Sequence, residues 1–86
     1  MRKLVFTTAG WEDYLYWQSR DKQMLKKANG LLKEIQRDPF NGIGKPEPLK
    51  GELSGAWSRR LDDANRLVYV VTDSQIRVIA CRRHYA

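Results

Sequence analysis

The sequence predicts an α+β fold, and three observations support that prediction. The chain has 86 residues, a length at which a single domain spanning residues 1–86 is expected. Apolar residues recur at helical spacing between residues 11 and 35, and they alternate with period two between residues 56 and 83. Because the helical pattern comes first, we expect an N-terminal strand and two helices packed on an antiparallel sheet.

The first elements follow from a change of period near the N-terminus. Residues 3–7 form a short run of β-branched and aromatic residues, which predicts a strand. Thr8 can cap the helix that follows. Trp11, Tyr14 and Leu15 stand at positions i, i+3 and i+4, so they build one apolar face of that helix.

A second helix is expected after a new cap at Ser19 or Asp21. Its apolar stripe runs straight through Asn29-Gly30, so we expect the helix to continue there with a weak point and to end before Pro39. The stripe comprises Met24, Leu25, Ala28, Leu31, Leu32 and Ile35.

Residues 40–55 show no clear period and are expected to form a long loop. The segment holds four of the six glycines and two of the three prolines. A loop of this length in so small a domain is often functional. Gly42-Ile43-Gly44-Lys45 invites a phosphate-loop interpretation, but that motif needs Ser or Thr where this chain has Pro46.

The last third of the chain predicts three strands, at residues 56–61, 66–72 and 75–83. The turns between them are short, which favours an antiparallel meander. The middle strand is apolar on both faces. One face can pack on the helices, and the other needs cover from the long loop, a partner or a second subunit.

Charge and composition narrow the function classes. Sixteen Lys and Arg against ten Asp and Glu give a net charge of +6, which favours a polyanionic partner such as nucleic acid. The alternative is a basic protein without such a partner. The single Cys81 excludes an internal disulfide, and the longest strongly apolar run, residues 67–71, is too short to span a membrane. A reducing, cytoplasmic setting is expected.

The ionisable and aromatic side chains that remain as candidates suit metal-free cleavage of RNA. The sequence contains no pattern of metal-ligating residues and no recognisable Ser/His/Asp set, so we expect neither a metal nor another cofactor. RNA carries its own nucleophile, the 2′-OH. The protein then has to supply a general base, cations that stabilise the phosphorane, and a general acid for the leaving 5′-oxygen.

Several residues are candidates for these roles. Glu47, between Pro46 and Pro48, is the candidate base, and the alternative is a loop carboxylate in solvent. His84 is the only histidine and Tyr85 can stack on a base, although both are close to the chain end. The candidate cations are five arginines on or near the strands, for which solvated edge charges are the alternative: Arg59, Arg60, Arg66, Arg82 and Arg83. Strand alternation puts Arg59 and Arg60 on opposite faces, whereas the relation of Arg60 to Arg66 depends on the turn.

These residues lie in sequence blocks that resemble the YoeB (Txe) toxins of the RelE superfamily. The similarity runs from about residue 4 to residue 85, and its two most specific blocks are Lys-Pro-Glu-Pro-Leu-Lys and Trp-Ser-Arg-Arg. The other similar blocks are residues 11–17, 53–55, 65–69 and 81–85. The resemblance implies a small RelE-like domain that acts as the toxin of a bacterial toxin–antitoxin pair. Such toxins enter the ribosomal A site and cleave the mRNA there, stopping translation.

Matched positions imply roles for individual residues. Glu47 corresponds to the family's general base, His84 to its general acid and Arg66 to the arginine that stabilises the phosphorane. The resemblance assigns RNA positioning or assistance at the phosphate to Lys50, Arg60 and Tyr85, and we expect Arg59 to dock RNA as well. It further implies a YefM/Phd-type antitoxin and a homodimer. This chain departs from relatives at Arg83, where some have an aromatic residue, and at the additional Ala86.

A non-catalytic, basic nucleic-acid-binding module of the same fold is the alternative function. Binding alone needs the cations but does not need an acid–base pair. Glu47 together with His84 therefore separates the two hypotheses.

Overall fold

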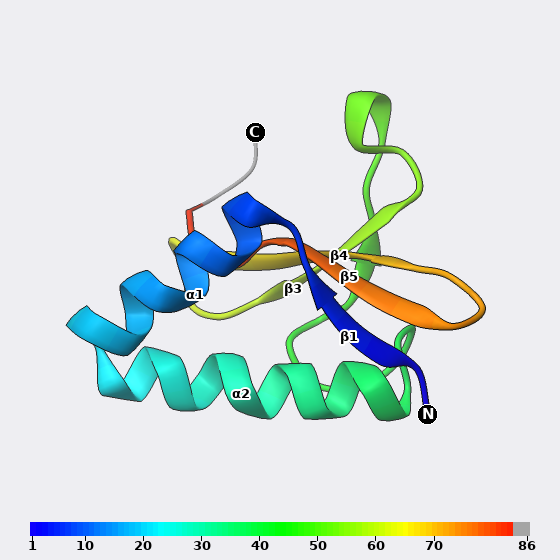
Figure 1. The fold of residues 1–86 in the computed structure, drawn as a ribbon. Coiled ribbons are helices and arrows are strands. Elements are labelled where there is room, and N and C mark those ends of the chain that lie inside the picture. The colour runs from blue at the N-terminus through cyan, green and yellow to red at the C-terminus, as the bar shows by residue number, and fades with distance from the viewer. Residues whose placement is uncertain (84–86) are drawn as a thin grey trace.

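The computed structural model describes residues 1–83, which form two helices and a five-stranded sheet (Figure 1). The elements in chain order are β1 (Lys3–Phe6), α1 (Thr8–Arg20), α2 (Lys22–Arg37), β2 (Glu47–Pro48), the 3₁₀ helix η1 (Gly51–Leu53), β3 (Ala56–Arg60), β4 (Arg66–Val71) and β5 (Gln75–Ala80). The predicted α+β class and the order of its main elements are confirmed. Within residues 1–83, neither α1 nor α2 has the length and apolar character that a membrane-spanning helix requires.

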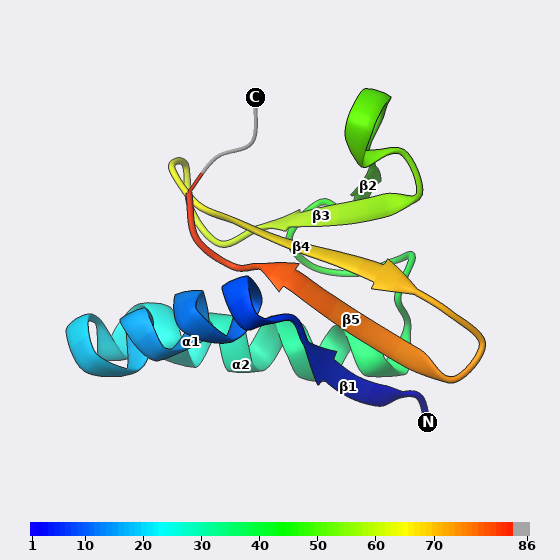
Figure 2. The same ribbon diagram turned by 45° about the horizontal axis from the view of Figure 1, so that its top comes forward.

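The sheet has the strand order β1-β5-β4-β3-β2, which Figure 2 shows from one edge to the other. The predicted antiparallel meander of β3, β4 and β5 is confirmed, but the sheet as a whole is mixed. β1 runs parallel to β5, pairing Leu4 with Ile76 and Phe6 with Val78. This pairing is possible because nearly the whole chain, including both helices, lies between the two strands and provides the crossover that parallel neighbours need. The two-residue β2, within the predicted loop, adds the other edge.

Both helices begin at side-chain caps. Thr7 accepts a hydrogen bond from the Gly10 N–H at its Oγ1, one residue before the expected cap at Thr8. Asp21 caps α2 as one of the two predicted residues, and α2 runs unbroken through Gly30. Gly10 is required by packing, because a Cβ there would lie 2.3 Å from the Val78 carbonyl oxygen. α1 therefore lies directly against β5.

The core lies between the two helices and one face of the sheet (Figures 1 and 2). From β4, Leu67 and Tyr69 point into this core and are fully buried. Side chains alternate along a strand, so Arg66 and Val68 belong to the opposite, helix-free face. Val68 is fully buried there as well, so the chain itself closes part of the face that was expected to need cover.

Candidate active site

Glu47 and Arg66 form the centre of the candidate site on the helix-free face. Arg66 Nη1 donates a hydrogen bond to Glu47 Oε1 at 3.0 Å. The two residues come from β2 and β4, which lie on either side of β3 (Figure 2). The Glu47 side chain is 56% exposed and that of Arg66 20%, so the carboxylate is open to a ligand while the guanidinium is more restricted.

Ser58 lies between these two residues and was missed as a site residue. It pairs with Glu47 across β2 and β3, and its hydroxyl accepts a second hydrogen bond from Arg66 Nη1, at 3.2 Å. Ser58 is fully buried in the sheet, so this contact anchors the Arg66 guanidinium to the sheet surface. The strand period places Ser58 on the same face as Arg60, a signal that was available in the sequence.

Arg60 shares the face of Arg66. The two are direct partners across β3 and β4, which answers the question that the sequence left open about this turn. Like charges directly opposite each other repel, and each arginine has its own acidic partner. Arg60 pairs with Asp63 and Arg66 with Glu47. Two cations therefore lie on the same face of the sheet, and Arg66 is the one that contacts the Glu47 carboxylate.

Arg59 does not belong to this site, so the expectation that it docks RNA is wrong. The residue is fully buried on the helix side of the sheet. Its guanidinium donates to the carbonyl oxygens of Asp38, Asn41 and Ile43, and its Nε donates to the Tyr69 hydroxyl at 3.1 Å. Strand alternation had correctly separated Arg59 from Arg60, but it did not indicate which of the two faces the core.

Hydrogen bonds from the buried Arg59 therefore hold the loop between α2 and β2, which leads to Glu47. Besides the contacts of Arg59, the Tyr69 hydroxyl donates to the Pro39 carbonyl oxygen at 2.7 Å. Burial raises the pKa of Tyr69, and the neighbouring Arg59 acts in the opposite direction. Lys50 is exposed beyond β2, three residues after Glu47.

The C-terminal segment reaches the site at Arg83. The Arg66 N–H donates to the Arg83 carbonyl oxygen at 2.9 Å, so residue 83 lies beside the candidate phosphate-binding arginine. The predicted strand at residues 75–83 ends earlier, at Ala80. His84 and Tyr85, the expected general acid and stacking residue, lie outside the described residues.

Cys81 is buried where β5 ends, as expected of a small apolar residue in the core. Burial, with a smaller contribution from the Asp13 carboxylate, raises the pKa of the thiol to about 12. The thiol stays protonated at neutral pH, which is the opposite of what a nucleophilic cysteine needs.

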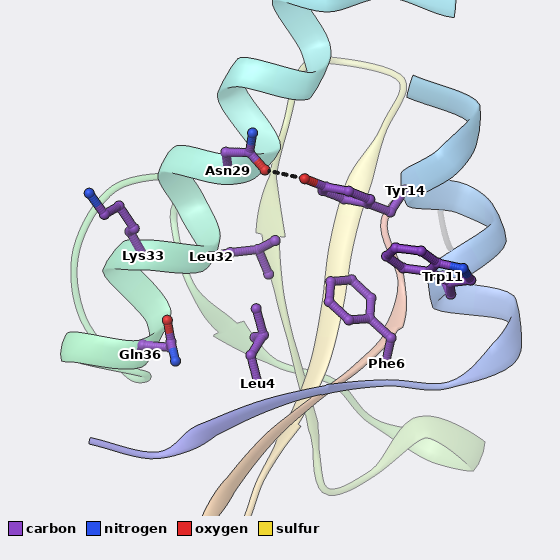
Figure 3. Close-up of a pocket in the computed structure, with 8 residues that line it drawn as sticks. All are labelled: Leu4, Phe6, Trp11, Tyr14, Asn29, Leu32, Lys33 and Gln36. Carbon is purple, nitrogen blue, oxygen red and sulfur yellow. Dashed lines mark hydrogen bonds between the residues drawn. The ribbon is translucent and has the colours of Figure 1, made fainter. Parts of the chain in front are cut away.

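A separate apolar pocket of about 440 Å³ lies between β1 and the two helices (Figure 3). Trp11 and Tyr14 of α1 line it, with their rings stacked 5.6 Å apart. The Tyr14 hydroxyl donates to Asn29 Oδ1 across the pocket. Of the residues expected to act on RNA, those within residues 1–83 do not line this pocket.

The Glu47–Arg66 arrangement can accept a proton and stabilise an anion within one small area. An exposed carboxylate at hydrogen-bond distance from a fixed guanidinium suits a base beside a phosphate site. The Glu47–Arg66 pair therefore makes the helix-free face the candidate active site, and the pocket of Figure 3 lies apart from this pair.

Comparisons with known proteins all indicate the same family, and the matches cover nearly the whole chain. Residues 6–85 match the family model described as YoeB-like toxin of bacterial type II toxin–antitoxin system. The chain is 54% identical to Toxin YoeB of Streptomyces coelicolor and 55% identical to Toxin YoeB of Escherichia coli. Each alignment covers 96% of this chain and 99% of the relative.

Solved structures of relatives have the same fold. A YoeB/ParE toxin from Agrobacterium tumefaciens superposes with a TM-score of 0.93 at 49% identity, covering 96% of this chain and 99% of the other. A YoeB dimer from Staphylococcus aureus gives a TM-score of 0.90 at 47% identity, covering 98% of each chain. A YoeB–YefM complex from the same organism gives 0.89 at 45% identity, covering 99% of each chain.

Proposed function

This chain belongs to the YoeB-like toxins of bacterial type II toxin–antitoxin systems, and on that premise we propose that it cleaves mRNA in the ribosomal A site. The cleavage stops translation. The reaction is a metal-free attack by the RNA's own 2′-OH. The Glu47–Arg66 pair, at 3.0 Å on the helix-free face of the sheet, is the observation that carries this proposal.

The step is a transesterification within the RNA. The Glu47 carboxylate takes the proton of the 2′-OH, and the O2′–P bond forms. Arg66 stabilises the negative charge of the phosphorane, the P–O5′ bond breaks, and His84 gives a proton to the leaving 5′-oxygen. The products are a 2′,3′-cyclic phosphate and a free 5′-OH.

The contacts of Arg66 suit this role. Its Nη1 is occupied by Glu47 and Ser58, and a guanidinium has five N–H donors in a fixed fork. Other donors are therefore available for phosphate oxygens while Ser58 holds the group in place. Because its position is fixed before the reaction, Arg66 stabilises charge that grows in the transition state at little cost in reorganisation.

RNA binding is assigned to exposed cations around the pair. Lys50 lies beyond β2, and the Arg60 side chain is 36% exposed beside Arg66. Together with the net charge of +6, these groups attract the phosphates of mRNA and ribosomal RNA. Tyr85 stacks on a base of the bound codon.

The partners follow from the family as well. We infer a YefM/Phd-type antitoxin, since a Staphylococcus aureus relative has been solved as a YoeB–YefM complex, and a homodimer, since the same relative has been solved as a YoeB dimer. The site of action is the cytoplasm, where ribosomes translate mRNA.

The test is the variant Glu47→Gln, which keeps the size of the side chain and removes the base. We expect cleavage on programmed ribosomes to fall about 10²–10⁴-fold, the range of a general base, while ribosome binding stays the same. Glu34→Gln is the matched control, because Glu34 pairs with Arg37 on α2, away from the candidate site.

The same experiment distinguishes the proposed nuclease from the alternative function. A non-catalytic binding module would inhibit translation without cutting the mRNA, and Glu47→Gln would leave that inhibition unchanged. Unchanged cleavage by Glu47→Gln would overturn the assignment of the base. Sequencing the product ends adds a second criterion, because a free 3′-OH contradicts attack by the 2′-OH.

A further inference from the structure

The last described residues are held in place by hydrogen bonds from two other parts of the fold. The Cys81 N–H donates to Asp13 Oδ2 at 3.1 Å, and the Cys81 carbonyl oxygen accepts from Trp17 Nε1 at 2.7 Å. Both partners belong to α1. The chain therefore leaves β5 from a fixed point.

Two residues later the backbone takes an unusual turn. Arg83 has a φ of 72°, in the left-handed region that few residues other than glycine adopt. Its N–H donates to Asn65 Oδ1 at 2.7 Å, and its carbonyl oxygen accepts from the Arg66 N–H at 2.9 Å. Strained conformations of this kind persist only where the surroundings hold them, and they cluster at functional sites.

The orientation of the Asn65 amide is itself fixed. Its Nδ2 donates to both carboxylate oxygens of Asp62, at 3.1 and 3.3 Å, so its oxygen faces Arg83. The Asp62 carboxylate also accepts from the N–H groups of Ala64 and Asn65. Partial burial raises the pKa of Asp62, but these hydrogen bonds outweigh it and lower the pKa, which keeps the group an ionised acceptor.

We propose that Asn65 is a positioning residue for the cleavage reaction. By holding Arg83 in its left-handed conformation beside Arg66, it fixes the point from which the chain continues to His84. The inference rests on the proposed function, in which His84 is the general acid. Asn65 acts through the backbone and does not touch the RNA.

Two adjacent residues therefore contribute to the reaction in different ways. Asn65 holds Arg83, the residue before the proposed acid, and Arg66 provides the guanidinium that binds the phosphorane. A displacement of about 1 Å at a reacting group can cost 10²-fold in rate. Loss of the Asn65 contact should therefore act on proton donation to the leaving group.

The test compares two ribosome-bound mRNAs, one normal and one with sulfur in place of the leaving 5′-oxygen at the mapped cleavage position. Sulfur departs without a proton, so it removes the need for the acid. We expect Asn65→Ala to cut the oxygen substrate about 10²-fold more slowly than the unmodified chain. On the sulfur substrate the two should differ by only a few-fold. Asn29→Ala, which removes an amide hydrogen bond to Tyr14 elsewhere, should change neither rate.

A further pair of variants separates positioning from a merely structural role. Arg83→Gly can adopt a φ of 72°, whereas Arg83→Pro has no N–H and a φ fixed near −65°. Only the proline variant should show the sulfur-dependent rescue, and this pair decides the matter if Asn65→Ala does not fold.

The outcomes distinguish this inference from the proposed function. Equal slowing of Asn65→Ala on both substrates, or equal rates of Arg83→Gly and Arg83→Pro on the oxygen substrate, overturns the positioning role. His84→Ala is run in parallel and should also be rescued by sulfur. If His84→Ala is not rescued, His84 is not the acid, and the proposed mechanism fails together with the inference.

Discussion

Replacing Arg59 by methionine should destabilise the folded chain by about 3 kcal/mol, although the residue does not belong to the candidate site. Arg59 is fully buried, and its guanidinium donates to three backbone carbonyl oxygens in the loop between α2 and β2. Methionine fills much of the same space and offers no donor. The substitution therefore leaves the carbonyl groups of Asp38, Asn41 and Ile43 without their partner.

The magnitude follows from those three acceptors. An unpaired buried polar group costs about 1–3 kcal/mol, and the low end applies here because these contacts are only partly buried. Three groups at about 1 kcal/mol each give the expected loss of about 3 kcal/mol. The same loop leads into β2, so cleavage should also fall through misplacement of Glu47.

The assay is urea unfolding followed by tryptophan fluorescence, with the slope m compared between variants to confirm two-state behaviour. Arg77→Met is the matched control, because Arg77 is exposed on β5 and its loss should change the free energy of unfolding by less than about 0.5 kcal/mol. A loss below about 1 kcal/mol for Arg59→Met would refute the idea that this arginine holds the loop.

Three further results are expected. Arg66→Ala should lower the cleavage rate on ribosomes about 10²–10³-fold with little loss of ribosome binding, and an equal fall in both would make Arg66 a docking residue. The free energy of unfolding should fall as the pH rises above about 8.5, with a slope of up to about 1.4 kcal/mol per pH unit. The reason is that the Cys81 thiol has a pKa of about 12 in the folded state, whereas the unfolded chain loses this proton at a lower pH. Urea unfolding of Cys81→Ala at pH 8.5–10 should show a smaller slope, and an unchanged slope would assign the effect to another group. Cleavage of a model RNA without ribosomes should persist in EDTA, and its abolition would contradict the metal-free mechanism.

Local patterns predicted most of the fold. The cap at Asp21, the continuous helix through Gly30 and the meander of β3 to β5 all depend on spacing along the chain, and all are confirmed. The parallel pairing of β1 with β5 was missed because it joins residues about seventy positions apart, which no local period reports. The two-residue β2 was missed for a similar reason, since its only support is the pairing with β3.

The candidate site was predictable in its residue types but not in its geometry. Glu47 stood out between two prolines, and its contact with Arg66 depends on a strand pairing that the sequence did not reveal. Arg59 and Arg60 are adjacent and chemically alike, and only the packing of the core decides that Arg59 is buried while Arg60 stays near the site. The strand period put Ser58 on the face of Arg60, but its contact with Arg66 could not be predicted before the strand pairing was known. The roles of Glu47, Arg66 and His84 stay predictions.

The identity of the nucleophile is the most direct test of the account. Ribosomes are programmed with one mRNA made entirely of ribonucleotides and a second in which the A-site codon and its neighbouring nucleotides carry 2′-H. Binding of the protein is measured on both complexes, and cleavage is followed by primer extension. We expect equal binding, rapid cleavage of the first mRNA and an intact second mRNA, because the attacking oxygen is missing. Cleavage of the second mRNA at a similar rate would contradict the account, since water would then be the nucleophile.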